Sequence, residues 1–101
     1  MTMIHKENIL NWAEPKGLLK YENRFKQYTK LQEESNELLI ALCDGNKEEI
    51  RDAIGDCVVV LTILANQVEM DIEDCIEYAY NQIKNRRGKT INGNFVKESD
   101  L

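Results

Sequence analysis

The chain has 101 residues, with 18 acidic and 13 basic side chains and a formal net charge of −5. This is the length of one domain with a modest core, which oligomerisation would enlarge. The acidic balance argues against a general nucleic-acid binder, and the longest apolar run, residues 57–65, is far shorter than the roughly 20 residues that cross a bilayer. We therefore expect one domain over residues 1–101, with no nucleic-acid or membrane partner.

Proline and glycine divide the first half of the chain into two predicted helices. The first covers about residues 4–12, because Pro15 disfavours a helical conformation at the residue before it. The second begins at Leu18 or Tyr21 and runs to residue 43. It is expected to end at Gly45, since glycine readily takes the left-handed conformation that closes a helix.

Capping residues mark two more helices. Asn46 is the predicted N-cap of a third helix that runs to about Val68, and Glu49 stands three residues later as the partner in a capping box. Asp71 caps a fourth helix over about residues 72–86. Helical signals therefore cover most of the chain up to its basic end.

Residues 88–101 form a basic and then polar C-terminal tail, which we expect to be irregular. Short connections between long helices make the neighbouring helices antiparallel. The predicted fold is all-α: a small antiparallel bundle of about four helices that oligomerises into a larger bundle, with no sheet.

The three cysteines indicate a reducing compartment. Cys43, Cys57 and Cys75 are odd in number, form no CxxC spacing and lie among apolar residues, as reduced core thiols do. The N-terminus lacks the apolar run of a signal peptide. We expect a cytoplasmic protein.

The second predicted helix carries carboxylates beside its apolar stripe. At about 100° per residue, Leu31 and Leu38 lie within about 80° of Glu34, whereas Glu33 points roughly the opposite way. Glu37 follows Glu34 at the three-residue spacing that brings side chains together. For this cluster alone, a solvated helix face is the simpler interpretation.

The third predicted helix has a matching feature. Asp52 and Asp56 are one turn apart on the same face, and the run that follows, residues 57–65, is apolar on every side, as in a buried helix. Asp56 therefore stands at the entrance to the interior, with Asp52 one turn before it.

Two acidic pairs on antiparallel neighbours favour a metal site. Two like charges ~4 Å apart repel by about 4 kcal/mol at an effective dielectric of about 20, so such carboxylates need raised pKa values or a cation. Oxygen ligands favour Mg²⁺, with Mn²⁺ as the alternative ion, over zinc. A di-iron bundle needs Glu-x-x-His pairs, and His5 is the single histidine. The predicted metal-ligating residues are Glu34, Glu37, Asp52 and Asp56.

Four basic residues crowd the end of the fourth predicted helix: Lys84, Arg86, Arg87 and Lys89. Compensation of the helix dipole is the simpler interpretation of this segment by itself. Beside a carboxylate metal site, the same segment suits a polyphosphate, because arginine binds phosphate oxygens in pairs and lysine acts as a point charge.

The chain resembles the MazG-like nucleotide pyrophosphohydrolases of the all-α NTP pyrophosphatase superfamily in residues 27–38 (QYTKLQEESNEL) and 52–61 (DAIGDCVVVL). Short single-domain members, often carried by bacteriophages, have tails similar to residues 83–89 (IKNRRGK) and 93–97 (GNFVK). The resemblance spans about residues 12–97.

This resemblance implies hydrolysis of a (d)NTP between its α and β phosphates, giving a (d)NMP and pyrophosphate. It also implies that the four carboxylates hold Mg²⁺, which binds the triphosphate and activates the attacking water, and that a homodimer or homotetramer completes the sites across subunits. The implied substrate-binding residues are Lys84, Arg87 and Lys89 for the phosphates, Lys30 for a phosphate or as the partner of Glu34, and Trp12 for stacking on the base or as a core anchor.

One position departs from the family pattern. The family's second element is ExxD, and aligning its aspartate with Asp56 places Ala53 where the glutamate belongs. Glu49 and Asp52 satisfy ExxD one turn earlier, but Glu49 is also the expected capping residue. We predict Asp52 with Asp56 as the second pair. The departure leaves a second hypothesis open, a non-catalytic acidic helical module that binds a partner or senses nucleotide.

Overall fold

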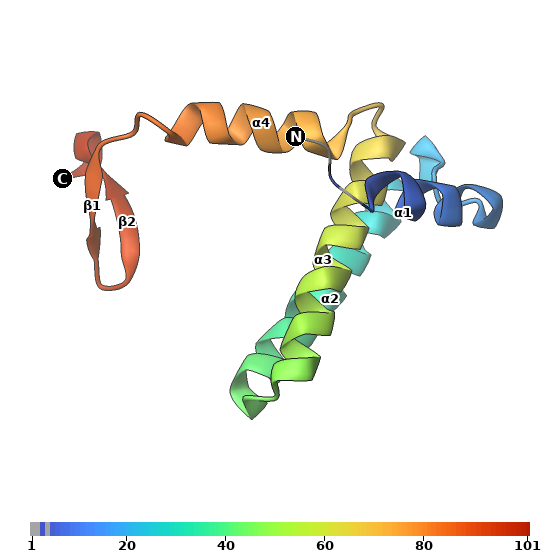
Figure 1. The fold of residues 1–101 in the computed structure, drawn as a ribbon, viewed down its shortest axis with the longest axis horizontal. Coiled ribbons are helices and arrows are strands. Elements are labelled where there is room, and N and C mark those ends of the chain that lie inside the picture. Colours follow the sequence, from blue (N-terminus) through green and yellow to red (C-terminus); the bar gives the residue numbers. More distant parts are fainter. Residues whose placement is uncertain (1–2, 4) are drawn as a thin grey trace.

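Two antiparallel helices of 21 residues each, α2 (Arg24–Asp44) and α3 (Lys47–Gln67), form the body of the protein in a computed structural model that describes residues 3 and 5–101 (Figure 1). Gly45 closes α2 with a φ of 68°, and Asn46 Oδ1 accepts a hydrogen bond of 3.1 Å from the Glu49 backbone N–H at the start of α3. Both predicted helix signals are confirmed, because they depend on local backbone chemistry.

The N-terminal helix α1 (Lys6–Ala13) packs against α3 and is followed by a 3₁₀ turn, Glu14–Lys16. The predicted start of this helix at Ile4 lies outside the described residues. A second 3₁₀ turn, Tyr21–Asn23, precedes α2, so the predicted start of the second helix is early by at least three residues.

The core lies where α1, α2 and α3 meet, and small side chains dominate it. Its buried apolar residues are Ala13, Ala41, Ala53, Val60, Ile63 and Ala65. Alanine at the contact between two helices allows their backbones to approach closely. The close contact of α2 with α3 is what brings polar groups on the two helices to face each other.

One stripe of α3 is buried and another is exposed. Val60 and Ile63 are 5% and 4% exposed, whereas Ile54, Val58 and Leu61 are 50%, 40% and 38% exposed. The run that is apolar on all sides is therefore only partly buried within one chain. The exposed stripe follows the i, i+4, i+7 spacing of one helix face.

Helix α4 (Ile72–Ile83) leaves α3 at a bend of 103° and extends away from the α2–α3 pair (Figure 1). Asp71 caps it as predicted, accepting a hydrogen bond of 2.9 Å from the Glu73 backbone N–H. The predicted predominance of helix, with four α-helices among the described residues, is confirmed. The predicted antiparallel bundle is wrong for α4, because the turn before it, with Glu69 at a φ of 61°, directs the helix outward.

A β-hairpin ends the chain, where an irregular tail without a sheet was predicted. Strands β1 (Gly88–Ile91) and β2 (Asn94–Lys97) pair antiparallel, with Gly88 opposite Lys97. Asn92 and Gly93 form the two-residue turn with φ values of 52° and 83°. An Asn-Gly pair between β-prone residues is a hairpin signal, and the prediction overlooked it.

No single helix among residues 3 and 5–101 is long and apolar enough to cross a membrane. Helices α3 and α4 pass the criteria of length and composition only together, as a pair bent by 103°.

The cysteines are free thiols, as predicted. Cys57 and Cys75 are half-buried, but Cys43 is exposed. The prediction of core thiols is therefore wrong for Cys43, because the end of α2 lies at the open tip of the helix pair (Figure 1).

Candidate functional site

Three carboxylates from the two facing helices meet midway along the α2–α3 pair. Glu34 and Glu37 lie one turn apart on α2, and Asp56 reaches them from α3, so that one oxygen of each side chain lies within 4.8 Å of the others. Glu34 is 6% exposed, Asp56 is half-buried and Glu37 is exposed. The structure thus brings together three of the four predicted metal-ligating residues.

The charges in this acidic group are only partly balanced. The pKa of Asp56 is raised, first by burial and then by the charges of Asp52 and Glu34. Lys30 partly offsets the repulsion, since its Nζ lies 3.3 Å from Glu34 Oε1, and the hydrogen bond to Glu34 raises the pKa of the lysine. A second positive charge beside Asp56 would lower its pKa again.

The donor set fits a divalent cation that prefers oxygen. All three side chains offer carboxylate oxygens, the ligands typical of Mg²⁺, Mn²⁺ and Ca²⁺. Glu34 Oε2 is buried and has no hydrogen-bond partner within the part of the chain that the structure describes. A buried carboxylate oxygen without a partner is costly, and coordination of a cation removes that cost. Glu34, Glu37 and Asp56 are the residues placed to hold such a cation.

Asp52 is exposed, one turn before Asp56, and lies outside the three-carboxylate group. With Glu37 and Glu49 it lines a separate cavity of about 240 Å³. Ala53, at the position of the family's glutamate, is 5% exposed and presents only a methyl group. The choice between Asp52 and Glu49 as a fourth ligand therefore stays a prediction.

A cleft of about 540 Å³ opens beside the acidic group, between α2, α3 and the segment after α1. Glu34 and Asp56 line it together with Lys26 and Lys30. Apolar side chains of α3 and of the loop before α2 line it as well: Leu18, Val59, Val60 and Ile63. Ligand sites commonly have this combination of apolar walls and a few polar groups, at volumes of about 300–1,000 Å³.

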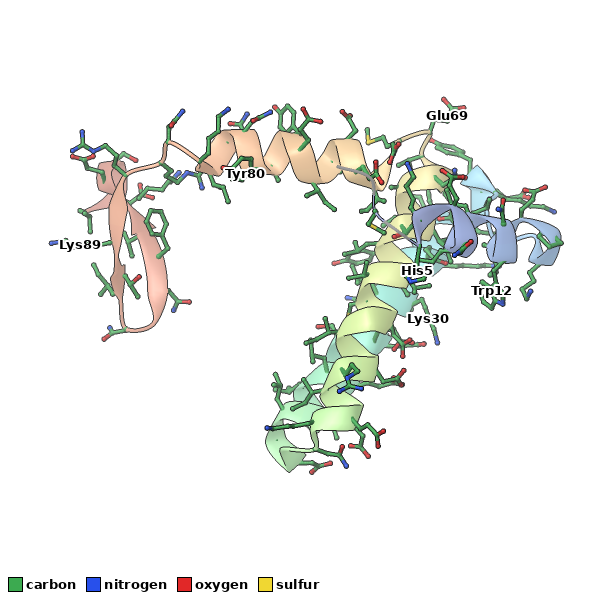
Figure 2. The ribbon with its side chains drawn as sticks, viewed as in Figure 1. His5, Trp12, Lys30, Glu69, Tyr80 and Lys89 are labelled. Atoms are coloured by element: carbon green, nitrogen blue, oxygen red, sulfur yellow. The ribbon has the colours of Figure 1, made fainter. Side chains whose placement is uncertain are left out.

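Trp12, on α1, and Lys30, on α2, both line this cleft, and their side chains are labelled in Figure 2. Trp12 is 53% exposed, with Lys16 Nζ 4.5 Å from the ring centroid, so the alternative of a core anchor is wrong. Of the two roles predicted for Lys30, the structure shows the pairing with Glu34. Lys26 was missed, although its four-residue spacing from Lys30 places both lysines on the face of Glu34.

The basic segment lies away from the acidic group of the same chain. Lys84 and Arg87 follow α4, and Lys89 lies on β1, on the opposite side of the molecule from Lys30 (Figure 2). Arg87 Nε is 3.7 Å from Glu98 Oε2. The outward course of α4 explains the separation, so the structure does not bring these residues to the site within one chain.

Comparison with known proteins supplies the family. The phosphoribosyl-ATP pyrophosphohydrolase family matches residues 11–82, a range that contains Trp12, the acidic group and the cleft. The chain belongs to the phosphoribosyl-ATP pyrophosphohydrolase family. This family is all-α, NTP pyrophosphatase-like and related to MazG. The predicted resemblance is confirmed at that level, and the narrower MazG-like assignment stays a prediction.

One curated relative comes from Haemophilus phage HP1 (strain HP1c1), an uncharacterised 18.2 kDa protein of the rep-hol intergenic region. The two sequences are 42% identical over 65 residues, which are 64% of this chain and 40% of the relative. The chain thus spans about two fifths of the length of that relative. No solved structure gives a significant match.

Proposed function

We propose that this protein is a Mg²⁺-dependent nucleoside triphosphate pyrophosphohydrolase of the MazG-like type, which cleaves a (d)NTP between the α and β phosphates to a (d)NMP and pyrophosphate. The observation that carries the proposal is the meeting of Glu34, Glu37 and Asp56 beside a cleft of nucleotide size, in a member of a nucleotide pyrophosphohydrolase family.

In this proposal the chain's own residues bind and orient the nucleotide. Glu34, Glu37 and Asp56 hold the cation, and the ion pair with Lys30 holds the Glu34 side chain in place. Lys26 and Lys30 supply positive charge in the cleft, where the phosphates would lie. When bound, a divalent cation neutralises phosphate charge and activates water for attack.

Trp12 serves the other end of the substrate in this proposal. Its ring is half-exposed at the rim of the cleft, and an aromatic face there offers a stacking surface to a nucleobase. Apolar neighbours such as Val60 and Ile63 exclude water from the same region.

A homodimer or homotetramer is part of the proposal. The stripe of α3 formed by Ile54, Val58 and Leu61 and the apolar side chains of α4 are exposed, and exposed apolar patches commonly mark interaction sites. On α4, Ile76, Tyr80 and Ile83 are 54%, 59% and 54% exposed. A second copy would cover this surface, and it would also bring Lys84, Arg87 and Lys89 towards a site of its partner.

The experiment is a panel of the eight common NTPs and dNTPs incubated with Mg²⁺, with pyrophosphate as the readout. The native chain is expected to release pyrophosphate from at least one nucleotide. Glu34→Gln should reduce kcat by about 100-fold or more, since it removes a buried ligand charge. The control Glu22→Gln alters an exposed carboxylate outside the cleft and should keep the native rate. No release from any nucleotide at high protein concentration contradicts the proposal.

Ala53 favours one second candidate, a module that binds nucleotide without cleaving it. With a methyl group where the family's glutamate belongs, the acidic group has three carboxylates. Titration calorimetry with Mg²⁺ separates the candidates. If the protein is only a binding module, Glu37→Ala should leave its affinity for Mg²⁺ unchanged. If it is a hydrolase, the native chain should bind Mg²⁺, and Glu37→Ala should weaken that binding at least about tenfold.

A further inference from the structure

Gln67 presents an unused hydrogen-bond acceptor in the wall of the cleft. It is the last residue of α3, it is 2% exposed, and it lines the same cleft as Trp12 and the acidic group. Its Nε2 donates a hydrogen bond of 2.8 Å to the Leu18 carbonyl oxygen. This bond fixes which way the amide points, because the opposite orientation would set two acceptor oxygens against each other.

The other end of the amide has no partner. Gln67 Oε1 is buried and accepts no hydrogen bond from residues 3 and 5–101. In this same part of the chain, the only other buried side-chain atom without a partner is Glu34 Oε2, and both residues line one cleft. Native structures rarely leave such atoms unpaired, so two in one cleft indicate two places where a ligand supplies the missing partner.

The positions of Asp56 and Gln67 along α3 suit the two ends of a nucleotide. Gln67 follows Asp56 by eleven residues, which is about 16 Å along the helix axis. Between them α3 presents Val60 and Ile63, and Trp12 lies at the rim. The cleft therefore has carboxylates for a cation and phosphates at one end, an apolar wall on α3 in the middle, and the buried, unpaired acceptor of Gln67 at the other end.

We propose that Gln67 reads the nucleobase: its Oε1 accepts a hydrogen bond from the exocyclic amino group of adenine or cytosine. This inference rests on the proposed function and names the substrate class within it. Uracil, thymine and hypoxanthine carry a carbonyl oxygen at the corresponding ring position, which would face Oε1 with a second acceptor. Gln67 is thus a specificity-determining residue that selects adenine or cytosine over bases with a carbonyl oxygen at that position, guanine included.

Two matched pairs of substrates test this selection, dCTP against dUTP and dATP against dITP. We expect the amino-bearing member of each pair to have a kcat/KM at least about tenfold higher, because the carbonyl analogue leaves two buried acceptors unpaired. The role of Gln67 would be overturned if pyrophosphate is released but the two members of each pair have equal kcat/KM, or if the carbonyl member is preferred. Either result would leave the proposed hydrolysis standing.

A binding measurement tests the base selection by Gln67 separately from the proposed hydrolysis. If no nucleotide yields pyrophosphate, the proposed function fails, and calorimetry with dCMP against dUMP and with dAMP against dIMP still tests the base selection. Tighter binding of the amino-bearing member of a pair supports Gln67 as the residue that contacts the base. Equal binding within both pairs, or no binding of any of the four nucleotides, overturns it.

The residue itself is tested with Gln67→Met, which keeps the length of the side chain and removes both the acceptor and the donor to the Leu18 carbonyl oxygen. The preference within each pair should fall to about threefold or less. Gln27→Met is the matched control, since Gln27 lines the same cleft and its Nε2 donates to the Val60 carbonyl oxygen at 3.3 Å. It should keep the preference. Retention of the full preference by a folded Gln67→Met overturns the proposal.

A modified base makes the test independent of any variant. The triphosphate of 2-pyrimidinone deoxyribonucleoside has hydrogen where cytosine has its amino group. The native protein should use it at least about tenfold less efficiently than dCTP. Equal use of the two would contradict the hydrogen bond to the amino group, even if Gln67→Met fails to fold.

Discussion

Glu34 carries a carboxylate in a buried position, where a negative charge is unfavourable unless it is paired. Its neighbours show how far this charge is balanced. Lys30 pairs with one carboxylate oxygen, and the other oxygen is buried without a partner in the described chain. Asp56 lies opposite and has a raised pKa. A structural ion pair would satisfy both oxygens of Glu34, so the half-satisfied carboxylate indicates a site for a cation.

Removing one charge from the acidic group should stabilise the protein when no divalent cation is present. We expect Asp56→Asn to raise the apo Tm, because burial and the charges of Asp52 and Glu34 already disfavour the ionised form. Mg²⁺ should raise the Tm of the native chain, and a Mg²⁺ concentration of one hundred times Kd corresponds to about 2.7 kcal/mol of added stability. Asp56→Asn should lose most of this rise in Tm.

Differential scanning fluorimetry in EDTA and in Mg²⁺ checks both parts of this prediction. Asp44→Asn, at the exposed end of α2, is the control and should keep the native response to Mg²⁺. A native shift with Mg²⁺ in Asp56→Asn would exclude Asp56 from the metal site.

At the scale of elements, ion pairs join α1 to the start of α4. Lys6 Nζ lies 2.9 Å from Asp71 Oδ2 and 3.6 Å from Glu73 Oε2. The hydrogen bond from Lys6, together with the backbone N–H of Glu73, holds the pKa of Asp71 below its ordinary value. These contacts fix where α4 begins, and the turn at Glu69 directs it away from the helix pair.

Because the pKa of Asp71 is lowered in the folded protein, the free energy of unfolding depends on pH. The carboxylate stabilises the folded state above its unfolded pKa, and this contribution is lost as the pH falls through the lower, folded pKa. We expect Asp71→Asn to lower the free energy of unfolding near neutral pH and to flatten its decline between about pH 5 and pH 2. Urea titrations across that range measure it. A decline as steep as that of the native chain would show that Asp71 does not contribute.

The sequence was most informative where structure depends on neighbouring residues. Gly45, Asn46 and Asp71 mark helix ends through local hydrogen bonds, and the structure confirms all three. The meeting of Glu34 with Asp56 was also predictable, because a tight turn at Gly45 makes the two helices antiparallel. Local patterns therefore predicted the helices and most of the acidic group.

What the sequence did not predict depends on contacts between distant segments. The direction of α4 follows from the backbone at Glu69 and from ion pairs with α1, which no helical periodicity encodes. In the sequence, Gln67 is an ordinary polar residue at a helix end. Its unpaired Oε1 is evident only in the structure, where its Nε2 donates to the Leu18 carbonyl oxygen. The hairpin is different, since its Asn92-Gly93 signal was present in the sequence and overlooked.

At the scale of the whole molecule, the chain has an extended shape with extents of 48 × 34 × 26 Å, and α4 carries the hairpin away from the helix pair (Figure 1). The described part of α4 has no buried residue. A helix with an apolar face and no fully buried residue within its own chain is expected to pack against another molecule. This supports the proposed association of copies.

A charge in the exposed stripe of α3 should separate the copies. The native chain is expected to have a mass in solution of at least twice 11.7 kDa, and Val58→Lys should shift it towards the monomer. Leu101→Lys changes an exposed apolar residue at the chain end and should keep the native mass. Sedimentation equilibrium provides the measurement. A native monomer at micromolar concentration would contradict the proposed oligomer.

The identity of the products tests the central claim most directly. Phosphorus NMR of a reaction with Mg²⁺ and the preferred nucleotide distinguishes cleavage between the α and β phosphates from cleavage between β and γ. We predict a nucleoside monophosphate and pyrophosphate in equal amounts, formed by the native chain and abolished by EDTA or by Glu34→Gln. A nucleoside diphosphate with inorganic phosphate, or products that persist in Glu34→Gln, would contradict the account.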